Sequence, residues 1–134
     1  MTVKVGIVGV TGYTGGELIR LLLKHPEVKI VAASSRSNVG NPVSVVHRQL
    51  FEYMNLVECE IKAENYAQCD VVFLALPHGA SSAMAKELVA MGKKVIDLGA
   101  DFRLRDYETY QTWYGAEHAW PEVLPDIVYG LPEL

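Results

Sequence analysis

The residues with the clearest chemical potential are three glycines near the N-terminus, spaced G-x-x-G-x-x-G. They follow an apolar run at residues 3–8, which is typical of a buried parallel strand, and they precede a helical pattern at residues 17–24. A turn between such a strand and such a helix gathers free backbone N–H groups at the positive end of the helix dipole, where phosphate groups bind. The sequence therefore predicts a nucleotide-phosphate site. Its residues are Gly9, Thr11, Gly12, Tyr13, Thr14 and Gly15.

Each glycine of the motif has a separate physical task. Gly9 permits a tight turn at the end of the strand, and Gly12 lets a pyrophosphate approach the backbone with no Cβ in the way. Gly15 lets the helix pack closely on the strand. Because the motif lies between this strand and this helix, we expect it to bind phosphate rather than to serve only as a structural turn.

The segment after a second expected strand, at residues 28–33, indicates which dinucleotide binds. NAD-binding folds place an acid there to take the ribose 2′-OH, whereas NADP-binding folds lack it and offer a base to the 2′-phosphate. No Asp or Glu occurs in residues 30–51. Ser35, Arg36 and Ser37 offer instead a guanidinium fork and two hydroxyl groups. We therefore predict that the cofactor is NADP, in its reduced form NADPH.

Two further segments follow expected strands, and ligands of doubly wound sheets lie at the carboxyl ends of the strands. Pro77 and His78 follow the apolar run at residues 71–76, so His78 either lines the nicotinamide side of the site or only begins the next helix. Asp101 and Arg103 follow the next strand along the chain. Arg103 is a candidate for holding an anionic substrate, and Asp101 is either its ion-pair partner or a helix cap.

No residue of the chain fits the role of a catalytic nucleophile. A redox enzyme of the type that reduces acyl phosphates needs a thiolate as nucleophile, with a histidine as acid and base. Cys59 lies inside an alternating run and Cys69 precedes a strand, so we expect both to be small apolar core residues. His25, His47 and His118 do not follow strands, and we expect structural roles for them. We therefore place no catalytic residue and no metal site in this chain.

The alternation of apolar strands with helical stretches predicts an α/β fold with a doubly wound, mostly parallel sheet of the Rossmann type. We expect one NADP-binding domain over residues 1–134. Ser81 or Ser82 is expected to cap a helix that Gly92 ends, and residues 43–53 show no clear period. Strands are expected at residues 3–8, 28–33, 56–61 (half-buried or at an edge), 71–76, 94–98 and 127–129, and helices at residues 17–24, 81–91 and 104–114.

Composition excludes several classes of partner. The 134 residues include 12 Lys and Arg against 16 Asp and Glu, a net charge of −4. No basic surplus exists to displace counterions, so we expect no nucleic-acid partner. No apolar run reaches the ~20 residues of a membrane span, and the N-terminus carries no signal-segment pattern. Two cysteines fit a reducing compartment. We therefore expect a cytoplasmic protein with no membrane partner.

Longer motifs occur at residues 9–18, 34–36, 73–79, 95–104 and 129–134. They include the runs G-V-T-G-Y-T-G-G-E-L, D-L-G-A-D-F-R and Y-G-L-P-E-L. Together, in this order, they resemble the N-acetyl-gamma-glutamyl-phosphate reductase family over nearly the whole chain. The glycine turn is shared with aspartate-semialdehyde dehydrogenases, whereas the other two runs are more specific. Gly99 departs from the pattern, because the family more often has Ser at that point.

The resemblance implies an NADPH-dependent step of arginine biosynthesis, in which N-acetyl-gamma-glutamyl phosphate becomes N-acetylglutamate 5-semialdehyde. In the family, a cysteine in an N-P-G-C motif attacks the acyl phosphate, phosphate leaves, and hydride from NADPH reduces the thioester. That cysteine follows the Y-G-L-P-E-L run, and the histidine and most substrate contacts come later, in a second domain. We therefore interpret the chain as the N-terminal cofactor-binding part of a protein that is a homo-oligomer when complete, and we expect this part alone to be inactive.

Two other interpretations stay open, and a third is discounted. Aspartyl phosphate is an alternative substrate, although the D-L-G-A-D-F-R and Y-G-L-P-E-L runs count against it. An extended short-chain dehydrogenase shares the glycine spacing but needs Tyr-x-x-x-Lys, and no tyrosine here has a lysine four residues later. A non-enzymatic NADP-sensing module would also combine a cofactor site with no nucleophile, so this chain alone does not separate it from the reductase.

Overall fold

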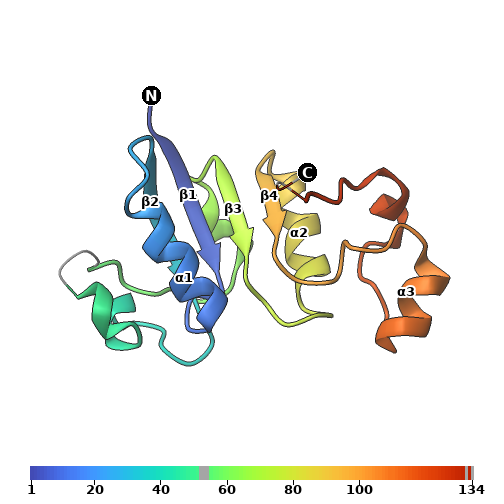
Figure 1. Cartoon of the computed structure of the whole chain (residues 1–134), viewed down its shortest axis with the longest axis horizontal. Coiled ribbons are helices and arrows are strands. Elements are labelled where there is room, and N and C mark those ends of the chain that lie inside the picture. Colours follow the sequence, from blue (N-terminus) through green and yellow to red (C-terminus); the bar gives the residue numbers. More distant parts are fainter. Residues whose placement is uncertain (52–54, 132, 134) are drawn as a thin grey trace.

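The computed structural model describes residues 1–51, 55–131 and 133. Within these residues, four strands form one parallel sheet in the order β2-β1-β3-β4 (Figure 1). The chain passes from β1 to β2 on one side and then crosses to β3 on the other side, so the strand order reverses between β1 and β3. This arrangement confirms the predicted doubly wound sheet. The strands are β1 (Val3–Val8), β2 (Val28–Ser34), β3 (Val71–Leu74) and β4 (Lys94–Asp97).

Three α-helices and several short 3₁₀ helices (η) accompany the sheet in the described part of the chain. Gly12, in an extended conformation, precedes the first helix, and the left-handed Gly92 follows the second. The third helix has Asp106 as its N-cap, because that carboxylate accepts a hydrogen bond from the Thr109 N–H at 2.8 Å. The elements are α1 (Tyr13–Leu22), η1 (Val43–Val45), η2 (Arg48–Leu50), η3 (Ala63–Tyr66), α2 (Ser81–Ala90), α3 (Tyr107–Tyr114) and η4 (Pro121–Asp126).

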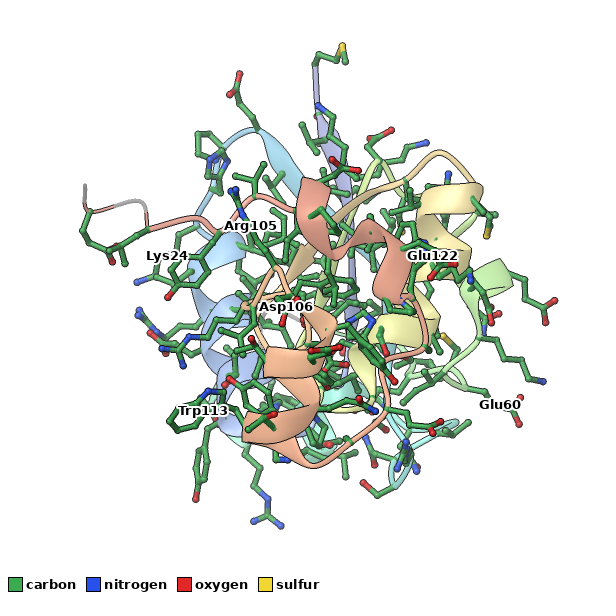
Figure 2. All side chains as sticks on the ribbon, turned by 90° about the vertical axis from the view of Figure 1, so that its right-hand side faces the viewer. Lys24, Glu60, Arg105, Asp106, Trp113 and Glu122 are labelled. Atoms are coloured by element: carbon green, nitrogen blue, oxygen red, sulfur yellow. The ribbon has the colours of Figure 1, made fainter. Side chains whose placement is uncertain are left out.

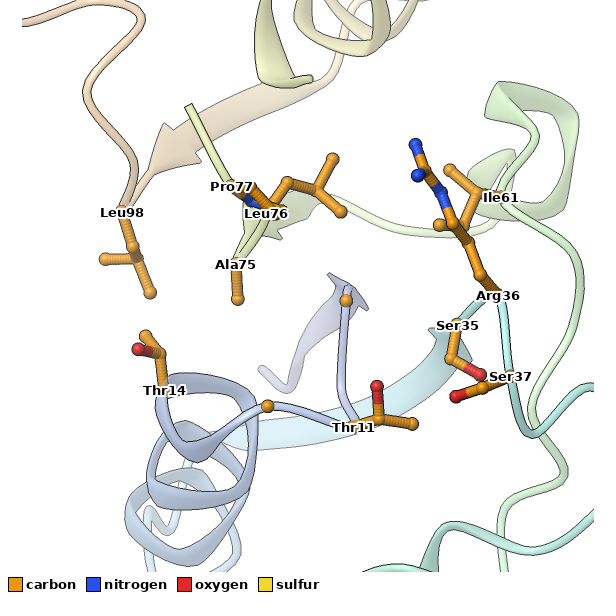
Figure 3. A pocket seen from close by; sticks show the side chains of 12 residues that line it. Thr11, Thr14, Ser35, Arg36, Ser37, Ile61, Ala75, Leu76, Pro77 and Leu98 are labelled. Atoms are coloured by element: carbon orange, nitrogen blue, oxygen red, sulfur yellow. The ribbon is translucent and has the colours of Figure 1, made fainter. Parts of the chain in front are cut away.

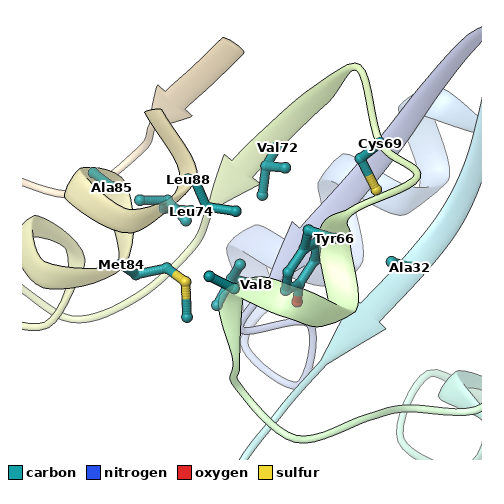
Figure 4. Close-up of a cluster of buried hydrophobic side chains, with 10 residues drawn as sticks. Val8, Ala32, Tyr66, Cys69, Val72, Leu74, Met84, Ala85 and Leu88 are labelled. Carbon is teal, nitrogen blue, oxygen red and sulfur yellow. The ribbon is translucent and has the colours of Figure 1, made fainter. Parts of the chain in front are cut away.

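Helices α1 and α2 pack on opposite faces of the sheet. Successive side chains of a strand point to opposite faces, so a single strand contributes to the apolar cluster under each helix. Val5 of β1 belongs to the cluster that contains Ile19 of α1. Val8 of the same strand belongs to the cluster that contains Leu88 of α2, and Figure 4 shows this second cluster around the ring of Tyr66. The sheet therefore has an apolar core on each side, and its strand ends are held in fixed positions.

Helix α3 and the segment after it lie beyond β4, at the opposite end of the molecule from β2 (Figure 1). Tyr110 is the buried residue of α3, whereas Trp113 is 77 % exposed, and Figure 2 shows its side chain at the periphery. No helix among the described residues is long and apolar enough to cross a bilayer.

Two predicted strands are wrong. Residues 56–61 form only two isolated bridges, because this segment meets β2 only at its last residue, Ser34, through Cys59. The other bridge joins Val57 to Pro42 in the loop after β2. Residues 127–129 are irregular and follow η4; no strand of the described part pairs with them, and Val128 is 89 % exposed.

Several predicted bounds also change. Helix α1 begins four residues earlier than expected, at the glycine turn itself, and α3 begins three residues later. Strand β3 ends at Leu74 and β4 at Asp97, each before the apolar run does. The segment without a clear period contains η1 and η2. Residues 52 and 53 of that segment, together with 132 and 134 of the last motif, lie outside the described residues.

Candidate dinucleotide site

A pocket of about 400 Å³ opens at the carboxyl ends of the strands, where the strand order reverses. Doubly wound sheets bind their ligands at this point. Figure 3 shows Arg36 and Ile61 at one end of the pocket and Thr14 and Leu98 at the other. The lining residues are Gly9, Thr11, Gly12, Thr14, Ser35, Arg36, Ser37, Ile61, Ala75, Leu76, Pro77 and Leu98.

The glycine turn is fixed to the end of β2 by backbone hydrogen bonds. The N–H groups of Gly9 and Val10 both donate to the carbonyl oxygen of Ser34, at 2.9 and 3.1 Å. Gly9 has a φ of +86°, a conformation that other residues rarely adopt. A Cβ on Gly15 would lie 2.7 Å from the carbonyl oxygen of Gly9. These contacts confirm the tight turn and the close helix packing that the sequence predicts for the two glycines.

Gly12 presents the N-terminus of α1 to the pocket. The helix has no side-chain cap and no acid in its first turn, so the first N–H groups lack partners from these sources within the described residues. A Cβ built on Gly12 meets no described atom within 4 Å, so the space above this residue is open. The side chain of Tyr13 is fully exposed, and Tyr13 is absent from the pocket lining, although the sequence predicts it as a site residue. An anion therefore has room and N–H donors here.

His47 supports the glycine turn from behind. Its Nε2 atom donates to the carbonyl oxygen of Val10 at 2.6 Å, and the residue is 8 % exposed. The ring fits because Gly16 has no Cβ; a Cβ there would lie 2.7 Å from Nδ1 of the ring. The structural role of His47 is therefore to hold the backbone of the glycine turn at Val10. Val10 is 37 residues away in sequence, so no local pattern predicts this contact.

The segment after β2 places three predicted residues in the pocket lining. Ser35 is 2 % exposed, and its Oγ accepts a hydrogen bond from the N–H of Asn38 at 3.1 Å. Arg36 and Ser37 are exposed at the pocket end that Figure 3 shows beside Ile61. A guanidinium and a hydroxyl group that face solvent beside a pocket are suited to an incoming phosphate.

The segment after β3 lies across the pocket from the glycine turn. Pro77 lines the pocket, but His78 does not: its ring lies beside that of Tyr114 in α3, with 5.9 Å between the ring centroids. Ala75 and Leu76 also line it, because the chain has already left the sheet at Leu74. The sequence prediction missed these two residues along with Ile61 and Leu98, since apolar side chains carry no chemical signal.

Asp101 caps helix α2. Its carboxylate accepts hydrogen bonds from the N–H groups of Gly79 at 2.5 Å and of Ser81 and Ser82 at 3.0 Å each. This corrects the expectation that Ser81 or Ser82 would cap the helix, because the N-cap residue is Ala80, without a side-chain bond. Of the two roles expected for Asp101, ion-pair partner of Arg103 or helix cap, the structure shows the helix cap.

Neither thiol lies in the pocket lining. Cys69 is 2 % exposed, and burial raises its pKa to about 11. Burial also raises the pKa of Cys59, whose Sγ–H donates to the carbonyl oxygen of Ala33 at 3.3 Å. Both are therefore poor nucleophiles at neutral pH. The described residues also contain no group of three or more His, Cys, Asp or Glu side chains that could hold a metal ion.

The fold and the pocket together define a dinucleotide-binding domain of the doubly wound class. Residues 4–134 match the family described as semialdehyde dehydrogenase, NAD binding domain, and the chain belongs to that family. It is 50 % identical over 134 residues to the N-acetyl-gamma-glutamyl-phosphate reductase of Symbiobacterium thermophilum and 52 % identical over 132 residues to that of Polynucleobacter asymbioticus. The alignments cover 100 % and 98 % of the chain, and 38 % of each of these relatives.

Solved structures agree with this assignment. Aspartate semialdehyde dehydrogenase from Candida albicans, solved with NADP, matches with a TM-score of 0.69 and 28 % identity, over 80 % of this chain and 32 % of that one. A Rex-family repressor, RSP, matches with a TM-score of 0.58 over 73 % of this chain and 46 % of that one, at 14 % identity, which shows the fold alone. The resemblance deduced from the sequence motifs is confirmed by the relatives, and the Rossmann-type fold by the structures.

Proposed function

We propose that the chain is the NADPH-binding part of a reductase that converts N-acetyl-gamma-glutamyl phosphate to N-acetylglutamate 5-semialdehyde in arginine biosynthesis. One observation carries the proposal: the glycine turn, Ser35-Arg36-Ser37 and Pro77 converge on one pocket at the reversal of strand order. The names of relatives about half identical to this chain support the substrate. The chain spans 38 % of their length, so the acyl phosphate would bind through the remainder of the protein.

The pocket fits a dinucleotide with a 2′-phosphate. The pyrophosphate would lie against the open face of Gly12 and accept from the N–H groups of the turn and of Tyr13, Thr14 and Gly15. The 2′-phosphate would lie at the other end, against the guanidinium of Arg36 and the hydroxyl groups of Ser35 and Ser37.

That orientation places the nicotinamide toward the pocket end formed by Thr14, Pro77 and Leu98. His78 directly follows Pro77 in the sequence. Bound NADPH supplies the hydride of the reaction. The residues of this chain hold and orient the cofactor: the helix N-terminus binds charge, and the apolar residues on the opposite side exclude water. The nucleophile and the proton-transferring histidine are assigned to the part of the protein beyond residue 134.

Aspartyl phosphate is the second candidate substrate, since an aspartate semialdehyde dehydrogenase resembles the chain in structure. Its identity to this chain is 28 %, against 50 % for the reductase relative, so we favour the reductase. For the whole protein we propose a cytoplasmic homo-oligomer with no nucleic-acid partner, in line with the net charge of −4 and a biosynthetic role.

The test is the activity of the full-length protein with each acyl phosphate, followed by the loss of NADPH absorbance. The proposal predicts oxidation with N-acetyl-gamma-glutamyl phosphate and little with aspartyl phosphate. Faster oxidation with aspartyl phosphate would select the second candidate. Binding of NADPH without turnover of either compound would favour a sensing module.

A further inference from the structure

The loop that carries Ser35, Arg36 and Ser37 runs from β2 to η1 without regular secondary structure, so side chains must hold it in place. Ser35 is one anchor, because its Oγ accepts from the N–H of Asn38. Ser35 and Asn38 are 2 % and 7 % exposed, whereas the two residues between them are exposed. The exposed pair therefore lies between two buried anchors.

The side chain of Asn38 connects the loop to the segment after residue 55. Its Nδ2 group donates to Oε1 of Glu58 at 2.6 Å and to the carbonyl oxygen of Pro42 at 3.3 Å. The backbone of Glu58 contacts the same loop: its N–H donates to Asn41 at 2.9 Å, and its carbonyl oxygen accepts from Gly40 at 2.8 Å. Glu58 thus holds the loop through both its backbone and its side chain.

Glu58 is an unfavourable residue to bury. It is 1 % exposed, and its second carboxyl oxygen, Oε2, has no hydrogen-bond partner within the described residues. None of the ion pairs found in that part of the chain includes it. An acidic group in such a place costs stability. The one hydrogen bond that the Glu58 carboxyl group makes within the described residues is the one it accepts from Asn38, which holds the loop.

We propose that Glu58 and Asn38 are positioning residues for the choice between NADPH and NADH. The inference rests on the proposed function, in which Arg36 and its neighbours bind the 2′-phosphate. A loop that is held before binding loses less entropy when it captures the phosphate. The pyrophosphate contacts lie at the glycine turn and do not depend on this anchor. Disturbing the anchor should therefore weaken NADPH binding and spare NADH binding.

The decisive variant is Asn38→Asp, which replaces the Nδ2 donor by a carboxylate oxygen facing Glu58. We expect NADPH affinity to fall roughly tenfold and NADH affinity to change less than about twofold. Adding Glu58→Gln to this variant restores the hydrogen bond with its direction reversed, because the new amide at position 58 donates to the new carboxylate at position 38. The double variant should recover most of the preference for NADPH over NADH. Fluorescence titration of the 134-residue chain with each cofactor measures both affinities.

Asn65→Asp is the matched control. The Nδ2 group of Asn65 donates to the carbonyl oxygen of Glu60 at 2.9 Å, outside the loop. Loss of this hydrogen bond should leave the cofactor preference unchanged. If Asn38→Asp does not fold, Glu58→Leu removes the acceptor without bringing two carboxylates together, and the same loss of preference is expected.

Equal losses of NADPH and NADH affinity, or an unchanged preference in the folded variant, would show that Glu58 and Asn38 are only structural. The proposed function would still stand if the unmodified chain prefers NADPH. An unmodified chain without that preference would overturn the cofactor assignment and this inference together.

Discussion

Asp101 and Ser82 are 19 residues apart in sequence, yet the Asp101 carboxylate accepts a hydrogen bond from the Ser82 backbone N–H at 3.0 Å. The same carboxylate also accepts from the hydroxyl group of Tyr110 at 3.2 Å, and Asp101 is fully buried. The N-terminus of α2 is therefore held by a residue that follows β4. Since Pro77 lies just before this helix, the contact also fixes one wall of the pocket.

The first prediction concerns this cap. Asp101→Asn keeps one acceptor oxygen but turns an NH₂ group toward backbone N–H groups, so we expect the free energy of unfolding to fall by about 2 kcal/mol. Urea denaturation followed by circular dichroism measures the change. Asp126→Asn, at an exposed position, is the matched control and should change stability by less than about 0.5 kcal/mol. Equal stabilities of the two variants would show that the cap is dispensable.

The second prediction concerns Gly12. Because an added Cβ meets no described atom within 4 Å, Gly12→Val should fold with a loss of no more than about 1 kcal/mol. It should nevertheless abolish NADPH binding, since the side chain occupies the space assigned to the pyrophosphate. Calorimetry measures binding and circular dichroism measures folding. Gly130→Val, where an added Cβ also meets no described atom, is the control and should bind normally. A folded Gly12→Val chain that binds NADPH like the unmodified chain would place the phosphate site elsewhere.

The third prediction is a loss of stability at alkaline pH. Burial raises the pKa of Cys69 from 9.0 to about 11, so the unfolded chain releases this proton at a lower pH than the folded chain does. Stability is therefore full below pH 9.0 and falls as the pH rises toward about 11. Burial also raises the pKa of Cys59 and of Tyr66, which acts in the same direction.

Urea titrations at a series of pH values test this dependence. Cys69→Ala should show a shallower fall than the unmodified chain over the same range. Identical slopes would mean that the Cys69 thiol ionises equally well in the folded and unfolded chains.

The fourth prediction is that the 134-residue chain binds NADPH but reduces nothing. Cys59 and Cys69 lie outside the pocket lining, and without a thiolate to capture the acyl group nothing aligns it with the hydride. The assay is NADPH oxidation with N-acetyl-gamma-glutamyl phosphate, with the full-length protein as positive control. Turnover by this chain that disappears in Cys59→Ser or Cys69→Ser would reveal a misassigned nucleophile.

Local patterns were enough to predict the four strands of the sheet, because continuous apolar runs bounded by turn residues leave few alternatives. They were also enough to predict Gly9, Arg36 and Pro77 in one pocket, since the carboxyl ends of parallel strands meet at one edge of a sheet. The segment at residues 56–61 alternates like a strand but forms only isolated bridges, to the last residue of β2 and to the loop after it. The alternation alone does not show how little of a partner strand the segment meets.

Contacts between distant residues were not predictable from the sequence. The anchor of Asn38 by Glu58 spans 20 residues, and the cap of α2 by Asp101 was only one of the roles considered. Ile61 and Leu98 line the pocket through apolar surface, which has no distinctive residue type or spacing. His78 follows the expected strand, yet its ring lies beside that of Tyr114 in α3, a residue distant in sequence.

The most direct test of the account is the affinity of the unmodified chain and of Arg36→Ala for NADPH and NADH, measured by fluorescence titration. The unmodified chain should bind NADPH at least several-fold more tightly than NADH, because a lost charged contact costs ~1.5–3 kcal/mol. Arg36→Ala should remove most of this preference by weakening NADPH binding alone. Equal affinities of the unmodified chain for the two cofactors would contradict the assignment of this pocket to NADPH.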